Sequence, residues 1–535
     1  MIVLMTCPGT KGQENGKIWF TQVPDWGNPA MDLIGRVDVN PQEYMVAGII
    51  FVEEAGGWWT KPSFANPAVA IGDDSTFILD FTSGGLDAYS TRLLTVLVPI
   101  GYPVPLLSGT PDLPADLLDN PYSIVARPHG DRVINWSGIN WIVKRSVDGL
   151  PLGPGPNVFS SEETQVYIDE EDCLHLNITN NGNDLWFSSE VIADTSFGYG
   201  TYKFKIKSQV DNFDVNSVNG LFTWDDIAIY SISSPDNFYR EYDVEFSYWS
   251  DPANDVAQYV IQPYYNPGNI FRFPMGSETN TTHLWIWKKD TIVFRSLNEN
   301  SVVISEFEYT GDDFHYPGTE NVRLNLWLIY GLAPLVEQEV IISGFEFENI
   351  LPSPQNVMAT EGEVLKVDVT WDMEPGTFYG IYRGTSAYLS DAVLLNEEWI
   401  NQENFEDTKV DTGVIYYYWI RASDNPQGSN TTGYSSGFSN YDTGWATDSN
   451  MYVGNNFPSS NIQVMPNPCY DSFRINFAEN TSGFFQLYDQ MGNLIMLRTV
   501  YSGEVLRIDG LSPGMYIMKL IIKDISYYKK IAVSY

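Results

Sequence analysis

Three carboxylates within five residues are the strongest chemical signal in this chain of 535 residues, in a segment (240–246) that reads REYDVEF. On a β-strand successive side chains point to opposite faces, so Glu241, Asp243 and Glu245 share one face and the apolar residues between them share the other. Clustered carboxyls suit acid, base or nucleophilic chemistry, because mutual repulsion keeps one of them protonated near neutral pH. The chain holds 68 Asp and Glu residues, so about one such triplet is expected by chance. The sequence around the triplet must therefore show whether it is catalytic.

The composition narrows the range of partners. The chain has 29 Lys and Arg residues, which gives a net charge of −39 at pH 7. This charge disfavours nucleic acid and anionic membrane surfaces, because both are themselves negative. A neutral partner is therefore expected. The three cysteines, Cys7, Cys173 and Cys469, lie in widely separated segments and predict no disulfide framework.

Aromatic and turn-forming residues together predict an all-β protein. The chain contains 33 Tyr, 28 Phe and 16 Trp beside 43 Gly and 31 Pro. Aromatic side chains favour strands and Gly and Pro favour turns, so the mixture is typical of a chain of β-sandwich modules. No long helix is expected, and no apolar run is long enough to span a bilayer.

The carboxylate segment lies inside the largest predicted module. Short apolar runs bounded by Gly, Pro and Asp predict a small immunoglobulin-like sandwich over residues 18–145, of unknown role. The segment PLGPGP at 151–156 indicates a boundary. Long aromatic strands then follow one another through residues 150–349, which predicts a large antiparallel sandwich.

Blocks of this large module occur in an order known from one enzyme family. Residues 197–207 contain a Gly-Tyr-Gly strand, 241–246 contain Glu-x-Asp-x-Glu, 282–294 contain a His-x-aromatic strand with short spacing, and 325–327 read Asn-Leu-Trp. Together they resemble glycoside hydrolase family 16, which includes laminarinases, lichenases and agarases. The resemblance implies a concanavalin A-like jelly roll and an O-glycosyl hydrolase.

The resemblance assigns Glu241 as nucleophile, Glu245 as general acid and base, and Asp243 as the residue that orients the nucleophile. A retaining glycosidase needs two carboxyls about 5 to 5.5 Å apart. Residues i and i+4 on a strand have Cα atoms about 13 Å apart, so the two Glu side chains must lean toward each other across the shorter Asp. Lining up like charges has no structural benefit, so catalysis is favoured over a solvated acidic strand. The implied activity is a secreted endo-β-glycanase that hydrolyses internal bonds of a β-glucan or galactan with retention.

Aromatic and polar side chains near these blocks are candidates for binding the polysaccharide, since aromatic platforms hold sugar rings at low entropic cost. Periodicity leaves open whether each Trp lies in the cleft or the core, and a single His in a strand is more often structural. The candidate substrate-binding residues are Trp224, Arg240, Trp249, Gln262, Tyr264, His283 and Trp327.

One acidic segment raises the question of a metal. Residues 169–172 read DEED and could ligate a structural calcium ion, as some members of the family do, but a solvated turn is the favoured interpretation. No catalytic metal and no organic cofactor are implied.

Two modules are predicted after the large sandwich. Runs within residues 352–446 resemble the B, C and F strands of a fibronectin type III domain, with Trp371 and a tyrosine of 416–418 expected in its core. A polar linker is predicted over 447–461.

The last module, residues 462–535, carries four short motifs in a fixed order. They are PNP at 466–468, Asp-x-x-Gly-Asn at 489–493, Gly-Leu-x-Pro-Gly-x-Tyr at 510–516 and a Lys pair at 529–530. They resemble the C-terminal sorting domain of type IX secretion, which occurs in Bacteroidetes. The resemblance implies the type IX secretion machinery as a partner and a location outside a Gram-negative cell or on its outer surface.

The start of the chain and the alternatives to hydrolysis stay open. Residues 1–15 begin MIVLM and look like the remnant of a signal peptide; Cys7 could carry a lipid that attaches the protein to the cell surface, and an unimportant N-terminus is as good an interpretation. The alternative functions are a catalytically silent carbohydrate-binding protein or adhesin, and a transglycosylase acting on cell-surface polysaccharide.

Overall fold

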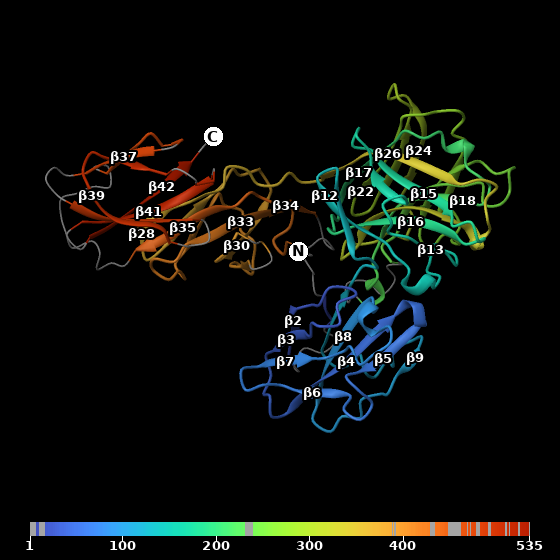
Figure 1. Ribbon diagram of the computed structural model, residues 1–535, viewed down its shortest axis with the longest axis horizontal. Coiled ribbons are helices and arrows are strands. Elements are labelled where there is room, and N and C mark those ends of the chain that lie inside the picture. The colour runs from blue at the N-terminus through green and yellow to red at the C-terminus, as the bar shows by residue number, and fades with distance from the viewer. Residues whose placement is uncertain are drawn as a thin grey trace. The chain divides into compact units, whose positions relative to one another are not determined.

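Strands dominate the computed structural model, which describes residues 7–9, 16–230, 239–387, 389, 392–428, 434–447, 462–467, 469–470, 472–477, 482–489, 494–508, 511–512, 514–522 and 525–533. Apart from strands, the regular elements formed by these residues are short 3-10 helices, so the all-β prediction is confirmed (Figure 1). The described residues form two compact units, the first within Met1–Ile350 and Ser429–Ser435 and the second within Leu351–Gly428 and Ser436–Tyr535. No helix in this described part of the chain is long and apolar enough to cross a membrane.

The first unit begins with a small sandwich built around β4 (Tyr44–Val52), which is buried on both faces. Val46 and Ile50 point into the core between two sheets, whereas Ala47 and Ile49 join a second apolar cluster on the other side. The larger sheet has the order β1 (Cys7–Gly9), β10 (Tyr122–Ala126), β8 (Arg92–Pro99), β4, β5 (Gly57–Lys61) and β9 (Ser108–Thr110), with β6 (Ala68–Ala70) paired to β4. The smaller sheet has the order β2 (Ile18–Gln22), β3 (Leu33–Val37) and β7 (Thr76–Leu79), and the 3-10 helices of this module are η1 (Glu53–Ala55) and η2 (Asp87–Tyr89).

The rest of the first unit is a large sandwich whose strands form one continuous hydrogen-bonded path. The path has the order β21 (Ile270–Phe273), β20 (Ala257–Ile261), β19 (Tyr242–Phe246), β18 (Ser217–Trp224), β25 (Asn321–Leu328), β16 (Trp186–Ala193), β15 (Leu174–Asn180), β26 (Gln338–Asn349), β17 (Gly200–Ile206), β22 (Thr281–Trp287), β23 (Ile292–Leu297) and β24 (Val303–Tyr309). Four short strands flank it: β11 (Arg132–Trp136), β12 (Ile139–Val143), β13 (Val158–Phe159) and β14 (Val166–Ile168). The 3-10 helices are η3 (Val147–Gly149), η4 (Val210–Asn212), η5 (Ala228–Tyr230) and η6 (Ile329–Gly331).

The two halves of this path face each other across one apolar core. Side chains of β18, β19 and β25 share a single buried cluster with those of β17, β22 and β26. The path turns from one layer to the other at the pairing of β15 with β16. The layer from β21 to β16 presents its outer face away from this core, and that face holds the site described below.

The large sandwich begins earlier in the chain than the predicted residue 150. Strand β12 pairs with β16, so residues 132–143 extend the large sheet and do not belong to the first module. The segment PLGPGP is a loop within the sandwich, closed by a bridge between Leu152 and Asn157, and not a linker. Pro and Gly are as suitable for such a loop as for a linker, which explains the misplaced boundary.

The second unit contains two further β modules. The first of them has one sheet of β27 (Met358–Ala359), β29 (Val367–Thr370) and β32 (Asn404–Asp407) and another of β28 (Glu361–Val364), β35 (Asp442–Thr447), β33 (Tyr416–Ser423), β30 (Phe378–Gly384) and β31 (Val393–Leu394), with β34 (Ser435–Phe438) on β33. Trp371 and Tyr418 lie in its core, as predicted; its relation to fibronectin type III domains stays a prediction.

The final module also consists of two sheets. They are β36 (Gln463–Met465), β37 (Ser472–Asn476) and β40 (Glu504–Arg507), and β39 (Leu494–Tyr501), β38 (Ser482–Tyr488), β41 (Gly514–Ile522) and β42 (Ile525–Val533). The predicted linker lies outside the described residues apart from Thr447, and so does the predicted signal-peptide remnant apart from β1.

Candidate active site

Strand β19 separates its side chains between core and cavity as the sequence predicted. Tyr242, Val244 and Phe246 are completely buried in the sandwich core, where the Tyr242 ring lies 5.1 Å from that of Trp287 on β22. The carboxylates of residues 241, 243 and 245 line a cavity on the opposite face. The predicted alternation is therefore confirmed.

The cavity has a volume of about 670 Å³ and crosses several strands. Antiparallel pairing places Phe222 and Gly220 of β18 beside Asp243 and Glu245, and places Gln258 of β20 on the other side of Glu245. The groove thus runs across the sheet, with the three carboxyls near its middle. Residues that line it include Glu190, Phe222, Trp224, Glu241, Asp243, Glu245, Trp249, Gln258, Gln262, Tyr264, Arg272, Arg323, Asn325 and Trp327.

Amide side chains hold two of the carboxyls in place. Gln258 donates from Nε2 to Oε2 of Glu245 at 2.7 Å, and Arg272 on β21 donates from Nε to Oε1 of Gln258 at 2.8 Å. Gln262 donates a longer hydrogen bond, 3.3 Å, to Oδ2 of Asp243. Gln258 is thereby locked with its amide toward Glu245.

Burial raises the pKa of all three carboxyls. Repulsion from Glu245 adds to the raised pKa of Glu241, and repulsion from both glutamates adds to that of Asp243. The hydrogen bond between Asp243 and Glu241 has opposite effects on their two pKa values: it lowers the pKa of Glu241 and raises that of Asp243. The hydrogen bond therefore favours a protonated Asp243 that donates to Glu241, while burial and repulsion raise the pKa of Glu241 to about 8. Burial raises the pKa of Glu245, whereas the hydrogen bond from Gln258 and the positive charge of Arg272 lower it.

Gly220 leaves space beside Glu245 for the side chain of Asn325. The amide of Gly220 donates to Oδ1 of Asn325 at 2.9 Å. A Cβ at position 220 would lie only 2.6 Å from that oxygen. Glycine therefore allows Asn325, part of the Asn-Leu-Trp block, to approach the strand next to the carboxyls.

Five of the seven predicted substrate-binding residues line the cavity: Trp224, Trp249, Gln262, Tyr264 and Trp327. The indole of Trp224 stacks on the ring of Tyr239, with centroids 4.2 Å apart and planes within 6°, and donates to Asp226 at 2.9 Å. The rings of Trp249 and Trp327 meet at 73° with centroids 6.3 Å apart. Both groups present fixed aromatic surface to the groove.

The predictions for Arg240 and His283 as substrate contacts are wrong. Arg240 is only 1% exposed, pairs with Asp225 at 2.5 Å and donates to the carbonyl of Tyr316. His283 is completely buried on β22, between the hydroxyls of Thr281 and Ser296. Arg240 lies in the turn before β19, with a left-handed backbone (φ 52°), so the alternation of the strand does not extend to it. His283 belongs to the opposite layer, which the spacing of the blocks does not reveal.

The acidic segment 169–172 does not fit a calcium site. The Asp169 carboxylate accepts hydrogen bonds from the amides of Glu171 and Cys173 and contacts the His175 ring at 3.1 Å. In the described part of the chain, no group of three His, Cys, Asp or Glu side chains is arranged to hold a metal ion. The segment is a turn stabilised by its own first carboxylate.

Several lining residues were not predicted from the sequence. Gln258 and Arg272 lie on strands that follow β19, but their positions beside Glu245 depend on register, which a loop of ten residues between β19 and β20 does not fix. Glu53 and Arg92 come from the first module, more than a hundred residues away in sequence. No local pattern could have indicated them.

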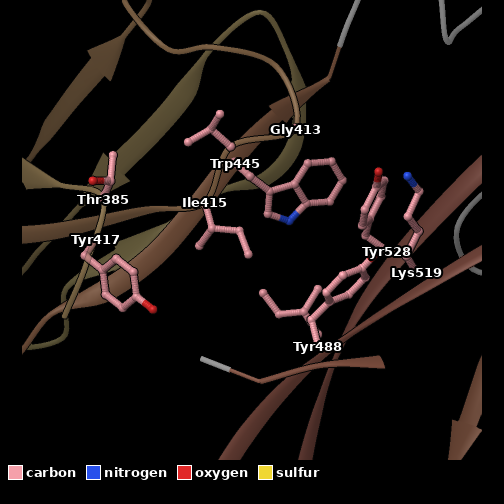
Figure 2. A pocket seen from close by; sticks show the side chains of 10 residues that line it. Thr385, Gly413, Ile415, Tyr417, Trp445, Tyr488, Lys519 and Tyr528 are labelled. Atoms are coloured by element: carbon pink, nitrogen blue, oxygen red, sulfur yellow. The ribbon is translucent and has the colours of Figure 1, made fainter. Parts of the chain in front are cut away.

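A second cavity, of about 390 Å³, lies in the second unit. Figure 2 shows Tyr417, Trp445, Tyr488, Tyr528 and Lys519 around it. Its described lining contains no carboxylate, so it cannot supply the acid and nucleophile of glycoside hydrolysis.

Comparison with known proteins identifies the end of the chain. Residues 463–534 match the family described as the secretion system C-terminal sorting domain. The predicted sorting domain is therefore confirmed, and the protein is secreted or located at the cell surface. A search of curated proteins found no match.

Solved structures similar to this chain align with about two fifths of it. A β-glucanase of Bacillus licheniformis is 16% identical over 41% of this chain and 97% of its own, with a TM-score of 0.31. A family 16 endo-glucanase from Bacteroides ovatus is 12% identical over 39% and 94%, with a TM-score of 0.28. A pseudo β-1,3-glucanase of Mycobacterium tuberculosis is 14% identical over 39% and 90%, with a TM-score of 0.29.

Proposed function

We propose that the protein is a secreted endo-β-glycanase of glycoside hydrolase family 16 that cleaves internal bonds of a β-linked polysaccharide with retention. The observation that carries the proposal is the convergence of Glu241, Asp243 and Glu245 in one groove, with a hydrogen bond between the first two. Buried like charges are costly and a groove floor does not need them for folding. Aromatic platforms on both sides suit sugar rings.

In the first step, the Glu241 carboxylate attacks the anomeric carbon while Glu245 gives its proton to the leaving glycosidic oxygen. The bond between the anomeric carbon and the glycosidic oxygen breaks, and the sugar is held as an ester of Glu241. In the second step, Glu245 takes a proton from water, whose oxygen attacks the same carbon and releases Glu241. Asp243 keeps its proton throughout and orients Glu241 by its hydrogen bond.

The groove itself argues against a silent lectin. A binding protein has no use for two partly buried glutamates with raised pKa in one groove, and separate environments for them would have favoured that function. Glu241 and Glu245 instead line one cavity, linked through Asp243. A transglycosylase would use the same first step with a sugar in place of water, so an added acceptor distinguishes it from a hydrolase.

The test is hydrolysis of a panel of polysaccharides, with laminarin, mixed-linkage glucan, agar, carrageenan and porphyran as substrates. Wild-type protein should release reducing ends from at least one of them, and Glu241→Gln and Glu245→Gln should each lose at least about 10³-fold in kcat. Glu299→Gln, which changes an exposed glutamate in the turn between β23 and β24, is the matched control. Absence of wild-type cleavage, or full activity in both cleft variants, would contradict the proposal.

A further inference from the structure

The loop that follows β18 connects the groove to the first module. Ile227 is 2% exposed and belongs to the apolar cluster formed by β4, β5, β8 and β10 of that module. Next to it, the Tyr230 ring meets Trp58 edge to face at 5.7 Å, and its carbonyl accepts a hydrogen bond from the Tyr122 hydroxyl at 2.7 Å. The large sandwich thus inserts a loop into the core of the first module.

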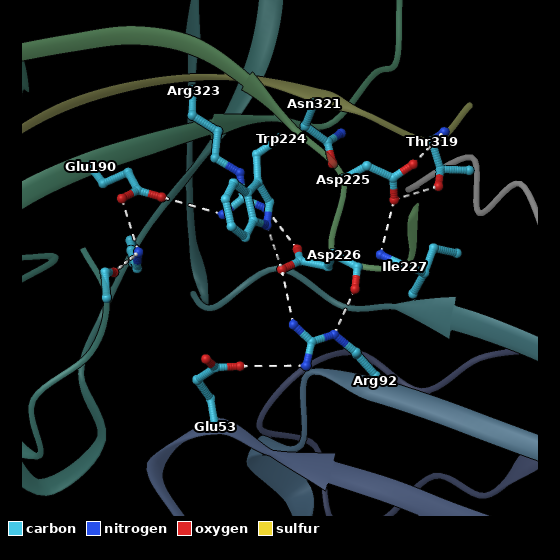
Figure 3. A network of polar contacts seen from close by, with 12 residues as sticks. Glu53, Arg92, Glu190, Trp224, Asp225, Asp226, Ile227, Thr319, Asn321 and Arg323 are labelled. Atoms are coloured by element: carbon cyan, nitrogen blue, oxygen red, sulfur yellow. Dashed lines mark hydrogen bonds and ion pairs between the residues drawn. The ribbon is translucent and has the colours of Figure 1, made fainter. Parts of the chain in front are cut away.

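The same loop carries a chain of alternating charges into the groove, shown in Figure 3. Arg92 of the first module donates to the carbonyl of Asp226 at 2.7 Å and lies 3.7 Å from its carboxylate. The Asp226 carboxylate pairs with Arg323 at 2.6 Å. Glu190 then bridges Arg323, at 3.5 Å, and Lys144, at 2.9 Å.

Glu53 stands at the first-module end of this chain and is its most accessible member. Its side chain is 36% exposed, whereas those of Arg92, Asp226, Arg323, Glu190 and Lys144 are 1 to 19% exposed. Its ion pair with Arg92 is long, at 3.7 Å. Carboxylate oxygens that are partly exposed and weakly paired remain able to accept hydrogen bonds from a ligand.

The position of these residues relative to the catalytic carboxyls follows from the sheet order. Strand β19 lies between β20 and β21 on one side and β18, β25 and β16 on the other. Arg323 and Glu190 are on β25 and β16, and Glu53 and Arg92 line the same cavity as Glu241. Trp224, which contacts Asp226 and Arg323, lines the same cavity as an aromatic platform.

We propose that Glu53 and Arg92 form an additional sugar-binding subsite, built by the first module, at the β16 side of the groove. The inference rests on the proposed function and specifies its substrate: the sugar bound there is uncharged. Three acids and three bases alternate in the network, so each cation of the network already has a carboxylate partner. An anionic substituent bound beside Glu53 would therefore meet no unpaired cation of this network. Hydroxyl groups, which donate to Glu53 and accept from Arg92, match the pair.

The test compares Glu53→Ala with wild-type protein on neutral laminari-, mixed-linkage and agaro-oligosaccharides, from disaccharide to octasaccharide. Wild-type kcat/KM should rise with length, and Glu53→Ala should lower the ratio of the longest to the shortest substrate by about 10-fold, the effect of one hydrogen bond to a charged group. A purely structural role would lower all lengths alike and leave the ratio unchanged, which would overturn the subsite. Asp73→Ala, an exposed acid elsewhere in the first module, should keep the wild-type ratio.

Calorimetric binding separates this inference from the proposed function. If no oligosaccharide is cleaved, the hydrolase proposal fails, and weaker binding of the same oligosaccharides by Glu53→Ala than by wild-type protein would still support the subsite. Equal affinity would overturn it. A sulfated carrageenan oligosaccharide should bind more weakly than a neutral one of equal length; tighter binding would overturn the assignment of an uncharged sugar.

Discussion

At the scale of single residues, the proton held by Asp243 is central to the site. Asp243 is 3% exposed and lies between two glutamates, so burial and repulsion favour its neutral form, and its hydrogen bond favours ionised Glu241. One carboxyl thereby stays neutral so that its neighbour can carry the charge needed for attack.

The Asp243→Asn variant tests how much folding stability the protein loses at neutral pH because the pKa of Asp243 is raised. Because the pKa of Asp243 is raised in the folded protein, the folded state binds more protons than the unfolded state, and stability falls as pH rises above the ordinary aspartate range. The variant lacks this penalty, so its melting temperature should exceed that of wild-type by about 3 °C near pH 7 and match it near pH 4. Its kcat should fall, and calorimetry at both pH values provides the stability measurement. An equal or lower melting temperature at pH 7 would contradict the assigned protonation.

Gln258→Met tests the control of Glu245. The Gln258 amide lowers the pKa of Glu245, so its removal should raise that pKa further. A general acid with a higher pKa stays protonated to higher pH, and the alkaline limb of the pH profile of kcat/KM should therefore move upward. A limb that stays in place would show that Glu245 does not determine it.

At the scale of elements, alternation along β19 was predictable and the partners of β19 were not. The apolar residues of 242–246 and the acids between them indicate two faces without any structure. Gln258 and Asn325 approach Glu245 through strand pairing over loops, and a shift of one residue would turn either side chain into the core. The position of Arg240 was not predictable in this way, because it lies in the turn before β19, where strand alternation does not apply.

Ile227→Ala tests the docking of the loop after β18. Removal of a buried Ile side chain costs about 2 to 4 kcal/mol, and here the lost contacts join the large sandwich to the first module. Limited proteolysis should cut the variant faster than wild-type in the segment between the two modules. The exposed neighbour Ile229→Ala is the control and should digest at the wild-type rate; equal rates for both variants would show that the loop does not fasten the module.

At the scale of the whole molecule, composition and motifs predicted the all-β architecture and the sorting domain. They could not predict that the first module lines the groove, because Glu53 and Arg92 reach it only through the packing of two sandwiches. The predicted module boundary near residue 150 was wrong for a related reason, since only strand pairing shows that β12 extends the large sheet.

Deletion of residues 463–534 tests the division of tasks along the chain. All residues lining the groove belong to the first unit, so the shortened protein should hydrolyse polysaccharide at the wild-type rate when purified. The same deletion should abolish release from the producing cells, because the sorting domain is missing. Loss of hydrolysis in the purified protein, with its fold intact by circular dichroism, would assign the sorting domain a role in the groove.

The proposed mechanism requires a covalent intermediate on Glu241. A 2-deoxy-2-fluoro glycoside with an activated leaving group, built on the sugar that the polysaccharide panel identifies, slows both steps and allows the intermediate to accumulate. Peptide mass spectrometry of the labelled wild-type protein should place the sugar on Glu241, and Glu241→Gln should remain unlabelled. Hydrolysis without any label, or a label on another carboxyl such as Glu245, would contradict the account.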